Sequence, residues 1–151
     1  MPSYQFEQVQ FIPRPRSEVF AFFADAANLE RITPSFLRFR ILSPLPIEMK
    51  PGALIDYRLS LYGLPIYWRT RIETFQPEVC FSDIQLKGPY RRWHHVHEFI
   101  ERDGGTEMHD RVSYELPFGP LGALARALFV RRSLDQIFAH RRTVVCEVFG
   151  S

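Results

Sequence analysis

The last part of the chain contains neither glycine nor proline from Ala123 to Phe149, and it is rich in alanine, leucine and arginine. These residue types favour helix, whereas glycine and proline are the residues that most often interrupt one. The sequence therefore predicts one long helix at the C-terminal end. Any fold for this chain has to provide a surface against which such a helix can pack.

Seven segments before this helix have the residue types and the alternation of β-strands. They are separated by proline- and glycine-containing turns, for example Gly88-Pro89 and Asp103-Gly104-Gly105. The predicted strands are residues 4–12, 36–42, 53–62, 66–75, 79–86, 90–100 and 106–116. Because most of the breaks are short, we expect consecutive strands to pair antiparallel.

Two short helices are predicted between the first two strands. Val19, Phe20 and Phe23 recur at helical spacing, and a second helical stretch runs from Ala26 to Ile32, where Pro34 stops it. The expected fold class is α+β, with a curved antiparallel sheet of seven strands wrapped on the long C-terminal helix. Two short helices and one long helix are too few to fill the concave side of a strongly bent sheet. We therefore expect a cavity between the sheet and the long helix.

Length and composition exclude several classes of protein. A chain of 151 residues fits one domain, residues 1–151, and leaves no room for a separate cofactor domain. The net charge is only +2 and the arginines are scattered, so we expect no nucleic-acid partner. The start at Met1 has no signal-peptide pattern and no segment is apolar enough to span a membrane, which predicts a soluble, cytoplasmic protein. Cys80 and Cys146 are too few for a disulfide scaffold.

Alternation predicts which strand residues face inward. In the strand 53–62 the apolar set includes Ile55, Tyr57 and Leu59, and in the next strand Trp68 lies on the apolar face. The strand 106–116 has a clear inward set that contains Asp110. A carboxylate on an inward face needs a partner, because an unpaired buried charge is costly.

The hairpin turns predict those partners. A tight turn at Gly88-Pro89 places Asp83 opposite His95 and Gln85 opposite Trp93. A turn at Asp103-Gly104 places His97 opposite Asp110. We therefore expect two Asp/His pairs side by side on the concave face of the sheet.

The residues around these pairs resemble the START/polyketide-cyclase-like superfamily (SRPBCC), which has the helix-grip fold. The most specific motifs are FSDIQLKGPY (residues 81–90), WHHVHEF (93–99) and DRVSY (110–114). Weaker matches are residues 15–23, 28–34, 51–52, 55–57 and 63–65 with Trp68. The sequence is similar to a bacterial ligand-binding or cyclase/dehydrase-like branch that also occurs fused to nucleoside-sugar epimerase-like domains. The resemblance implies the helix-grip fold and a hydrophobic ligand.

We expect the cavity to bind a small or medium hydrophobic molecule, lipid-like, aromatic or polyketide-like, without an obligatory cofactor. The residues expected to contact the ligand are Tyr57, Trp68, Phe81, Asp83, Gln85, Trp93, His95, His97, Asp110 and Tyr114. The Asp/His pairs have an alternative interpretation as a hydrogen-bond network that only fixes strand register.

Three other functions are weighed against ligand binding. A cyclase or dehydratase would use the same cavity, with His95 or His97 as the base. An interaction module would use the aromatic residues Tyr62, Tyr67 and Tyr90 and would have no enclosed cavity. A metal site at His-x-His with one carboxylate is disfavoured, because neighbouring strand positions satisfy coordination geometry only loosely.

The stretch from Leu121 to Val130 is apolar nearly all round. Such a segment is compatible with burial, with a lid over the cavity mouth, or with a homodimer contact. Burial of this end of the long helix is the preferred interpretation, and the oligomeric state is left open.

Overall fold

Seven antiparallel strands form one sheet in the computed structural model, which describes residues 3–61 and 63–150. The strands are β1 (Tyr4–Ile12), β2 (Arg40–Ile41), β3 (Leu54–Leu61), β4 (Leu64–Gln76), β5 (Cys80–Lys87), β6 (Arg92–Arg102) and β7 (Gly105–Glu115). Their order across the sheet is β1-β7-β6-β5-β4-β3-β2. Strands β2 to β7 are thus neighbours in chain order, and β1 closes the series beside β7. The predicted seven-stranded antiparallel sheet is confirmed.

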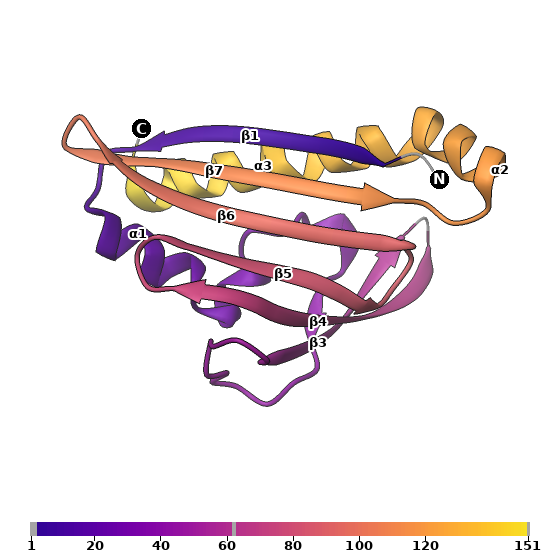
Figure 1. Cartoon of the computed structure of the whole chain (residues 1–151), viewed down its shortest axis with the longest axis horizontal. Coiled ribbons are helices and arrows are strands. Elements are labelled where there is room, and N and C mark those ends of the chain that lie inside the picture. The colour runs from indigo at the N-terminus through magenta and orange to yellow at the C-terminus, as the bar shows by residue number, and fades with distance from the viewer. Residues whose placement is uncertain (1–2, 62, 151) are drawn as a thin grey trace.

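The helices follow the predicted order. They are α1 (Arg16–Phe23), the 3₁₀ turns η1 (Ala26–Leu29) and η2 (Ser35–Leu37), α2 (Gly119–Ala125), the π turn η3 (Arg126–Val130) and α3 (Arg131–Phe149). From α2 to α3 the chain is helical without a break, and α3 runs along β1 and β7 (Figure 1). The long C-terminal helix is therefore confirmed, with a single π turn inside it.

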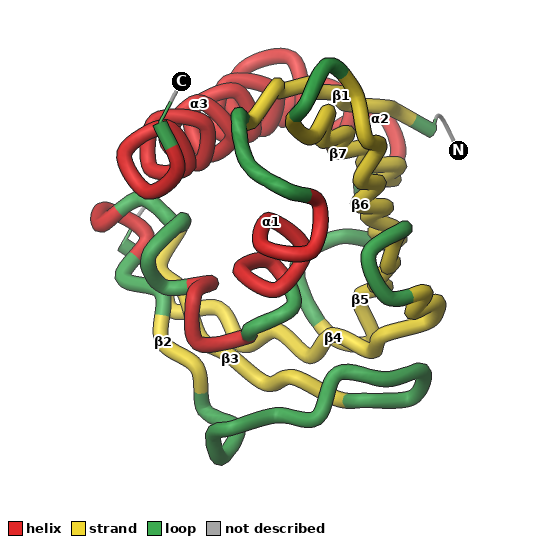
Figure 2. Tube along the Cα trace, turned by 90° about the vertical axis from the view of Figure 1, so that its left-hand side faces the viewer, coloured by secondary structure: helices red, strands yellow, loops and turns green. Residues whose placement is uncertain are grey.

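The sheet curves round the helices (Figure 2). Strands β1 and β7 lie beside α3, the sheet then bends through β5 and β4 to β3, and α1 sits inside the bend. Two side chains of β1 attach α3 to the sheet: the Nε2 atoms of Gln8 and Gln10 each donate to a backbone carbonyl of α3, at Phe138 and Arg142, at 3.1 Å. Because α3 is held at this edge, the curved sheet opposite it encloses space.

Three apolar clusters fill part of that space. One joins α1 to the sheet and to the end of α3, and in it the Phe20 ring meets the Phe99 ring edge-on at 5.1 Å. A second contains Tyr114 and Phe138, and a third contains Ile55. The clusters do not merge into one core, and the space between them is the cavity described below.

Two predicted elements after the first strand are shorter than expected. The segment 36–42 is not a full strand: Ser35–Leu37 forms a 3₁₀ turn and only Arg40–Ile41 pairs with β3. Arg38 adopts a left-handed conformation (φ 48°), which ends the turn and leaves Leu37 buried. The helix predicted from Ala26 to Ile32 is reduced to the turn η1, which Asp25 caps by accepting a hydrogen bond from the Ala27 amide at 3.0 Å. Alternating apolar residues in such short stretches do not distinguish strand from turn.

The predicted burial of the stretch from Leu121 to Val130 is wrong. Leu121, Leu124 and Leu128 are 71%, 55% and 57% exposed. In Figure 1, α2 lies past the end of β7, so no strand faces it. Within the described chain only the end of this segment, at Val130, packs on an apolar cluster, whereas Leu121, Leu124, Leu128 and Phe129 are exposed. No helix in the described residues is long and apolar enough to cross a membrane.

Candidate functional site

A cavity of about 180 Å³ lies between the sheet and α3. All three apolar clusters contribute to its wall. The lining residues come from α1, η1, η2, strands β3 to β6, α3 and the loops between them. Most of the lining is apolar, for example Ile55, Leu59, Leu134, Ile137 and Phe138. The predicted cavity between the sheet and the long helix is thus present.

Four aromatic side chains line one end of this cavity. The rings of Tyr57 and Trp68 stack at 5.7 Å, and Trp93 meets Trp68 edge-on at 5.3 Å. Tyr90 packs against Trp93 at 4.8 Å. These contacts position the rings as a rigid apolar wall, because each ring is held by its neighbours.

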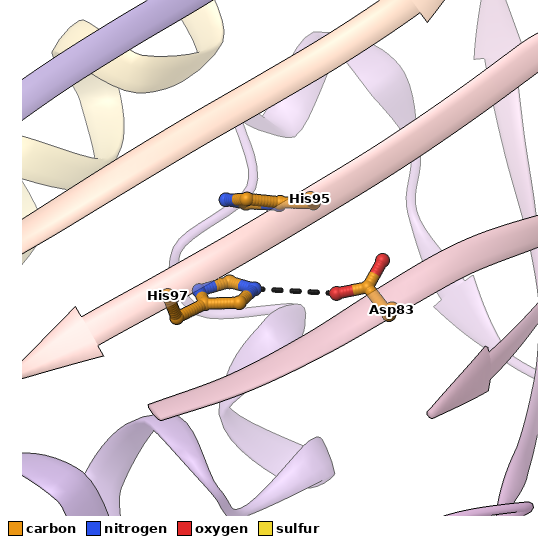
Figure 3. A group of neighbouring side chains, drawn as sticks. All are labelled: Asp83, His95 and His97. Carbon is orange, nitrogen blue, oxygen red and sulfur yellow. Dashed lines mark hydrogen bonds and ion pairs between the residues drawn. The ribbon is translucent and has the colours of Figure 1, made fainter. Parts of the chain in front are cut away.

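The floor of the cavity is polar and is formed by Asp83 of β5 with His95 and His97 of β6. Figure 3 shows the His95 ring over the His97 ring, with Asp83 beside them. The predicted register is confirmed: Asp83 is opposite His95, and His97 is opposite Asp110. The side chains nevertheless bond diagonally. His95 Nε2 lies 2.9 Å from Asp110 Oδ1, and His97 Nε2 lies 3.2 Å from Asp83 Oδ2. The imidazoles stack at 3.7 Å, and in this arrangement each reaches the carboxylate diagonal to it.

A buried arginine of α3 completes the floor. Arg141 Nη1 donates to Asp110 Oδ1 at 2.8 Å, and its guanidinium lies 5.0 Å from the centre of the Phe138 ring. Arg141 is not among the site residues predicted from the sequence. The signal was nonetheless present, because Arg141 shares helical spacing with Leu134, Phe138 and Val145, all of which are buried.

These contacts shift the pKa values of the floor in different directions. Burial alone would raise the pKa of the Asp110 carboxyl, but the Arg141 cation and the two imidazoles outweigh it and hold that pKa well below its usual value. The pKa of Asp83 is also lowered: burial alone would raise it, but the bond to His97 and the nearby charges of His95, His97 and Arg141 together outweigh burial.

The two histidines titrate differently although they are neighbours. Burial, together with the adjacent His97, lowers the pKa of His95 to about 4. Burial acts in the same direction on His97, but its contacts with Asp110 and Asp83 are stronger and raise its pKa above the usual value. At neutral pH, His95 is therefore the neutral imidazole and His97 the one that more readily holds a proton.

The structure brings most of the predicted site residues to the cavity. Those that line it are Tyr57, Trp68, Phe81, Asp83, Trp93, His95 and His97. Asp110 and Tyr114 are fully buried behind the lining. Gln85 is turned away, because its amide bonds the backbone of Tyr90 at 2.7 and 3.1 Å; the β5–β6 pairing ends at Ile84 and His94, so the predicted Gln85–Trp93 pair does not form.

Asp83, His95 and His97 could also be considered as metal ligands, since their ligand atoms lie within 4.8 Å of one another. The imidazole planes are stacked at 29°. Lone pairs lie in the ring planes, so two stacked rings direct them nearly parallel and not toward one ion. The arrangement is that of a hydrogen-bond network.

The proposed aromatic interaction surface is not continuous. Tyr67 is exposed and its hydroxyl donates to Asp56 at 2.9 Å, whereas Tyr90 lines the cavity. Tyr62 lies outside the described residues. An interaction module was expected to have no enclosed cavity, whereas the structure has a partly open cavity between the sheet and α3.

Comparison with known proteins identifies the family. The profile of the family described as "Polyketide cyclase / dehydrase and lipid transport" matches residues 12–140. The fold is similar to that of an aromatase/cyclase from Streptomyces sp. R1128, with a TM-score of 0.75, 14% identity, and coverage of 95% of this chain and 92% of that chain. A protein from Thermus thermophilus gives a TM-score of 0.71 and 17% identity over 97% of this chain and 99% of that one.

A third similar structure is a nucleoside-diphosphate sugar epimerase from Corynebacterium glutamicum. Its identity is 28%, its TM-score is 0.66, and the match covers 94% of this chain but only 28% of that longer chain. No curated protein matches the sequence significantly. Family membership supports hydrophobic ligand binding or cyclase activity in general. On the match over residues 12–140, the chain belongs to the polyketide cyclase/dehydrase and lipid-transport family and has the helix-grip fold.

Proposed function

We propose that this protein binds a small or medium-sized hydrophobic molecule in the cavity between the sheet and α3. The observation that carries the proposal is the cavity itself: apolar and aromatic walls with one polar floor. Ligand sites commonly have this composition, in which apolar walls supply most of the affinity and a few polar groups fix the orientation.

The polar floor supports binding because it is costly to bury. Two carboxylates, two imidazoles and a guanidinium lie together in this floor. The side chains of Asp110, His95 and Arg141 are at most 10% exposed. Ionised groups in such a place are tolerated when they are paired, yet an apolar packing would be at least as stable. We infer that the floor is present for its chemistry toward a ligand.

Binding can be measured with a neutral fluorescent probe, N-phenyl-1-naphthylamine, whose emission rises in apolar surroundings. We expect saturable binding to the wild-type protein. Leu59 lines the cavity, so the indole ring introduced by Leu59→Trp should occupy the cavity and abolish binding. The matched variant Arg58→Trp adds the same ring on the exposed face of β3 and should bind normally. Equal binding by both variants would contradict the proposed site.

A second candidate function is catalysis of a dehydration or cyclisation in the same cavity. The observation that favours it is the divergence of the two histidines, since neighbouring groups whose pKa values are pushed apart suit the roles of base and acid. His95 would remove a proton next to a carbonyl, and His97 would protonate the departing hydroxyl, which yields a double bond and water.

Turnover of a β-hydroxy ketone, followed by the absorbance of the enone product, tests this second function. We expect His97→Gln to lower the rate by about 10²-fold or more if His97 is the acid, because general acid–base groups contribute about 10²–10⁴-fold. Binding of N-phenyl-1-naphthylamine, measured on the same variant, separates a loss of chemistry from a loss of the cavity. Binding without any turnover would leave the protein as a carrier.

A further inference from the structure

Two residues that line the cavity each carry a buried N–H group with no hydrogen-bond acceptor within the described chain. These groups are Nε1 of Trp68 and Nε of Arg141. Both residues are more than nine-tenths buried. A buried donor without an acceptor costs about 1–3 kcal/mol, so native structures rarely leave one unsatisfied.

The surroundings of Arg141 show why its Nε is available. Its Nη1 atom is bonded to Asp110 at 2.8 Å, while the rings of Phe138 and Phe23 pack near the guanidinium at 5.0 and 5.9 Å. The aromatic side chains hold the guanidinium in place but offer no acceptor oxygen to Nε. The guanidinium is thus anchored by one edge, and Nε is left for another group.

Trp68 is held in a comparable way. Its ring is stacked on Tyr57 and contacts Trp93 edge-on. A row of ring contacts joins it to Arg141: Trp93 is 6.3 Å from His95, and His95 is 5.6 Å from Phe138. A flat molecule lying along this row would have donors available at both ends of the row.

The charge of the floor restricts what can accept these hydrogen bonds. Asp83 and Asp110 supply two negative charges, and Arg141 with His97 supplies at most two positive ones. His95 is neutral at pH 7, because its pKa is about 4. A ligand carboxylate would add a further buried negative charge with no cation left to balance it, which is strongly unfavourable.

We propose that Trp68 and Arg141 are specificity-determining residues, each of which donates to a neutral carbonyl oxygen at its own end of a ring-containing ligand, and that the cavity discriminates against carboxylic acids. This proposal rests on the proposed function, since it names the chemical class of the ligand in the same cavity. A carbonyl oxygen accepts hydrogen bonds without adding charge, so it satisfies the unpaired donors at no electrostatic cost.

Three naphthalene probes of the same ring system test the proposal by displacing N-phenyl-1-naphthylamine: 2-ethylnaphthalene, 2-acetylnaphthalene and 2-naphthoate. We expect the ketone to bind about 10-fold more tightly than the hydrocarbon, which corresponds to a gain of about 1.4 kcal/mol. The carboxylate should bind more weakly than both. Equal binding of the ketone and the hydrocarbon, or tighter binding of the carboxylate, would overturn the proposal.

Variants then assign the preference to the two donors. Trp68→Phe combined with Arg141→Lys removes both N–H groups and keeps the positive charge, and the ketone preference should fall below about threefold. The matched variant Tyr67→Phe with Arg142→Lys should keep it, since neither of these side chains lines the cavity. If the double variant does not fold, Trp68→Phe alone, which changes no charge, must reduce the preference.

Ligand binding in the cavity and the preference for a ketone can be tested separately. If the wild-type protein binds the hydrocarbon but shows no preference for the ketone, the specificity proposal is wrong and the proposed cavity function stands. If none of the three probes displaces N-phenyl-1-naphthylamine from the wild-type protein, the proposed function itself is wrong.

Discussion

His95 and Asp110 bind each other across β6 and β7, at 2.9 Å between Nε2 and Oδ1, although the residue opposite Asp110 in the sheet is His97. The same oxygen of Asp110 also lies 2.8 Å from Arg141 Nη1 and 3.3 Å from His97 Nδ1. One buried carboxylate therefore joins two positions of the sheet to the long helix. The predictions below follow from this arrangement and from the packing around it.

Asp110 should be more important for stability than Asp83. We expect Asp110→Asn to lower the free energy of unfolding by about 3–5 kcal/mol, because it leaves Arg141 buried without its counter-charge. Asp83→Asn should cost clearly less, since this side chain is 15% exposed and bonds one imidazole. Urea unfolding of both variants measures the difference. Equal losses would show that Asp110 is not the centre of the network.

The two histidines predict a stability maximum close to the usual histidine pKa of 6.5. As the pH falls from 6.5 toward 4, the unfolded chain takes up a proton at His95 that the folded protein does not, so stability is lost, on the order of a few kcal/mol. His97 has a raised pKa, so its contribution is fully present below pH 6.5 and is lost as the pH rises through its folded pKa. Asp83 and Asp110, with lowered pKa values, add to the acid loss only below about pH 3.8.

Urea unfolding at several pH values between 4 and 8.5 tests this maximum. His95→Gln keeps a donor toward Asp110 but does not titrate, and it should flatten the acid side of the curve. His97→Gln should flatten the alkaline side. A wild-type curve that rises steadily across this range would refute the assignment of the two imidazoles.

The two ends of the C-terminal helix should respond differently to the same truncation. Leu134→Ala removes a side chain that is 1% exposed and should cost about 2–5 kcal/mol. Leu128→Ala removes one that is 57% exposed and should change stability by about 0.5 kcal/mol or less. Chemical unfolding compares the two directly. A large loss in the second variant would mean that α2 and η3 pack against something in solution.

Divalent metal should not stabilise the protein through the polar floor. The stacked rings of His95 and His97 do not direct their lone pairs toward one ion, and the Arg141 cation is bonded to the same network. We therefore expect equimolar Zn²⁺ or a chelator to leave the melting temperature unchanged. A shift of several degrees with Zn²⁺ that disappears in Asp83→Asn would show that the floor rearranges into a metal site.

The sequence determined the elements and their order, because turn residues and alternation act locally. Gly88-Pro89 and Asp103-Gly104 defined two hairpins, and counting from them was sufficient to place Asp83 opposite His95 and His97 opposite Asp110. The same local reasoning failed from residue 36 to 42, where the 3₁₀ turn and the left-handed Arg38 break the alternation.

Only the tertiary structure decided which side chains meet. Register places His97 opposite Asp110, yet Asp110 Oδ1 lies closer to His95 Nε2, at 2.9 Å, than to His97 Nδ1, at 3.3 Å. The Nε2 atom of His97, whose ring is stacked on that of His95, instead lies 3.2 Å from Asp83. Arg141 reaches Asp110 because α3 is held against β1, a contact between residues far apart in the chain. The apolar residues of α2 are exposed because the helix begins past the end of the sheet. Periodicity shows that a side chain lies on a face, but what it packs against is determined by how distant elements come together.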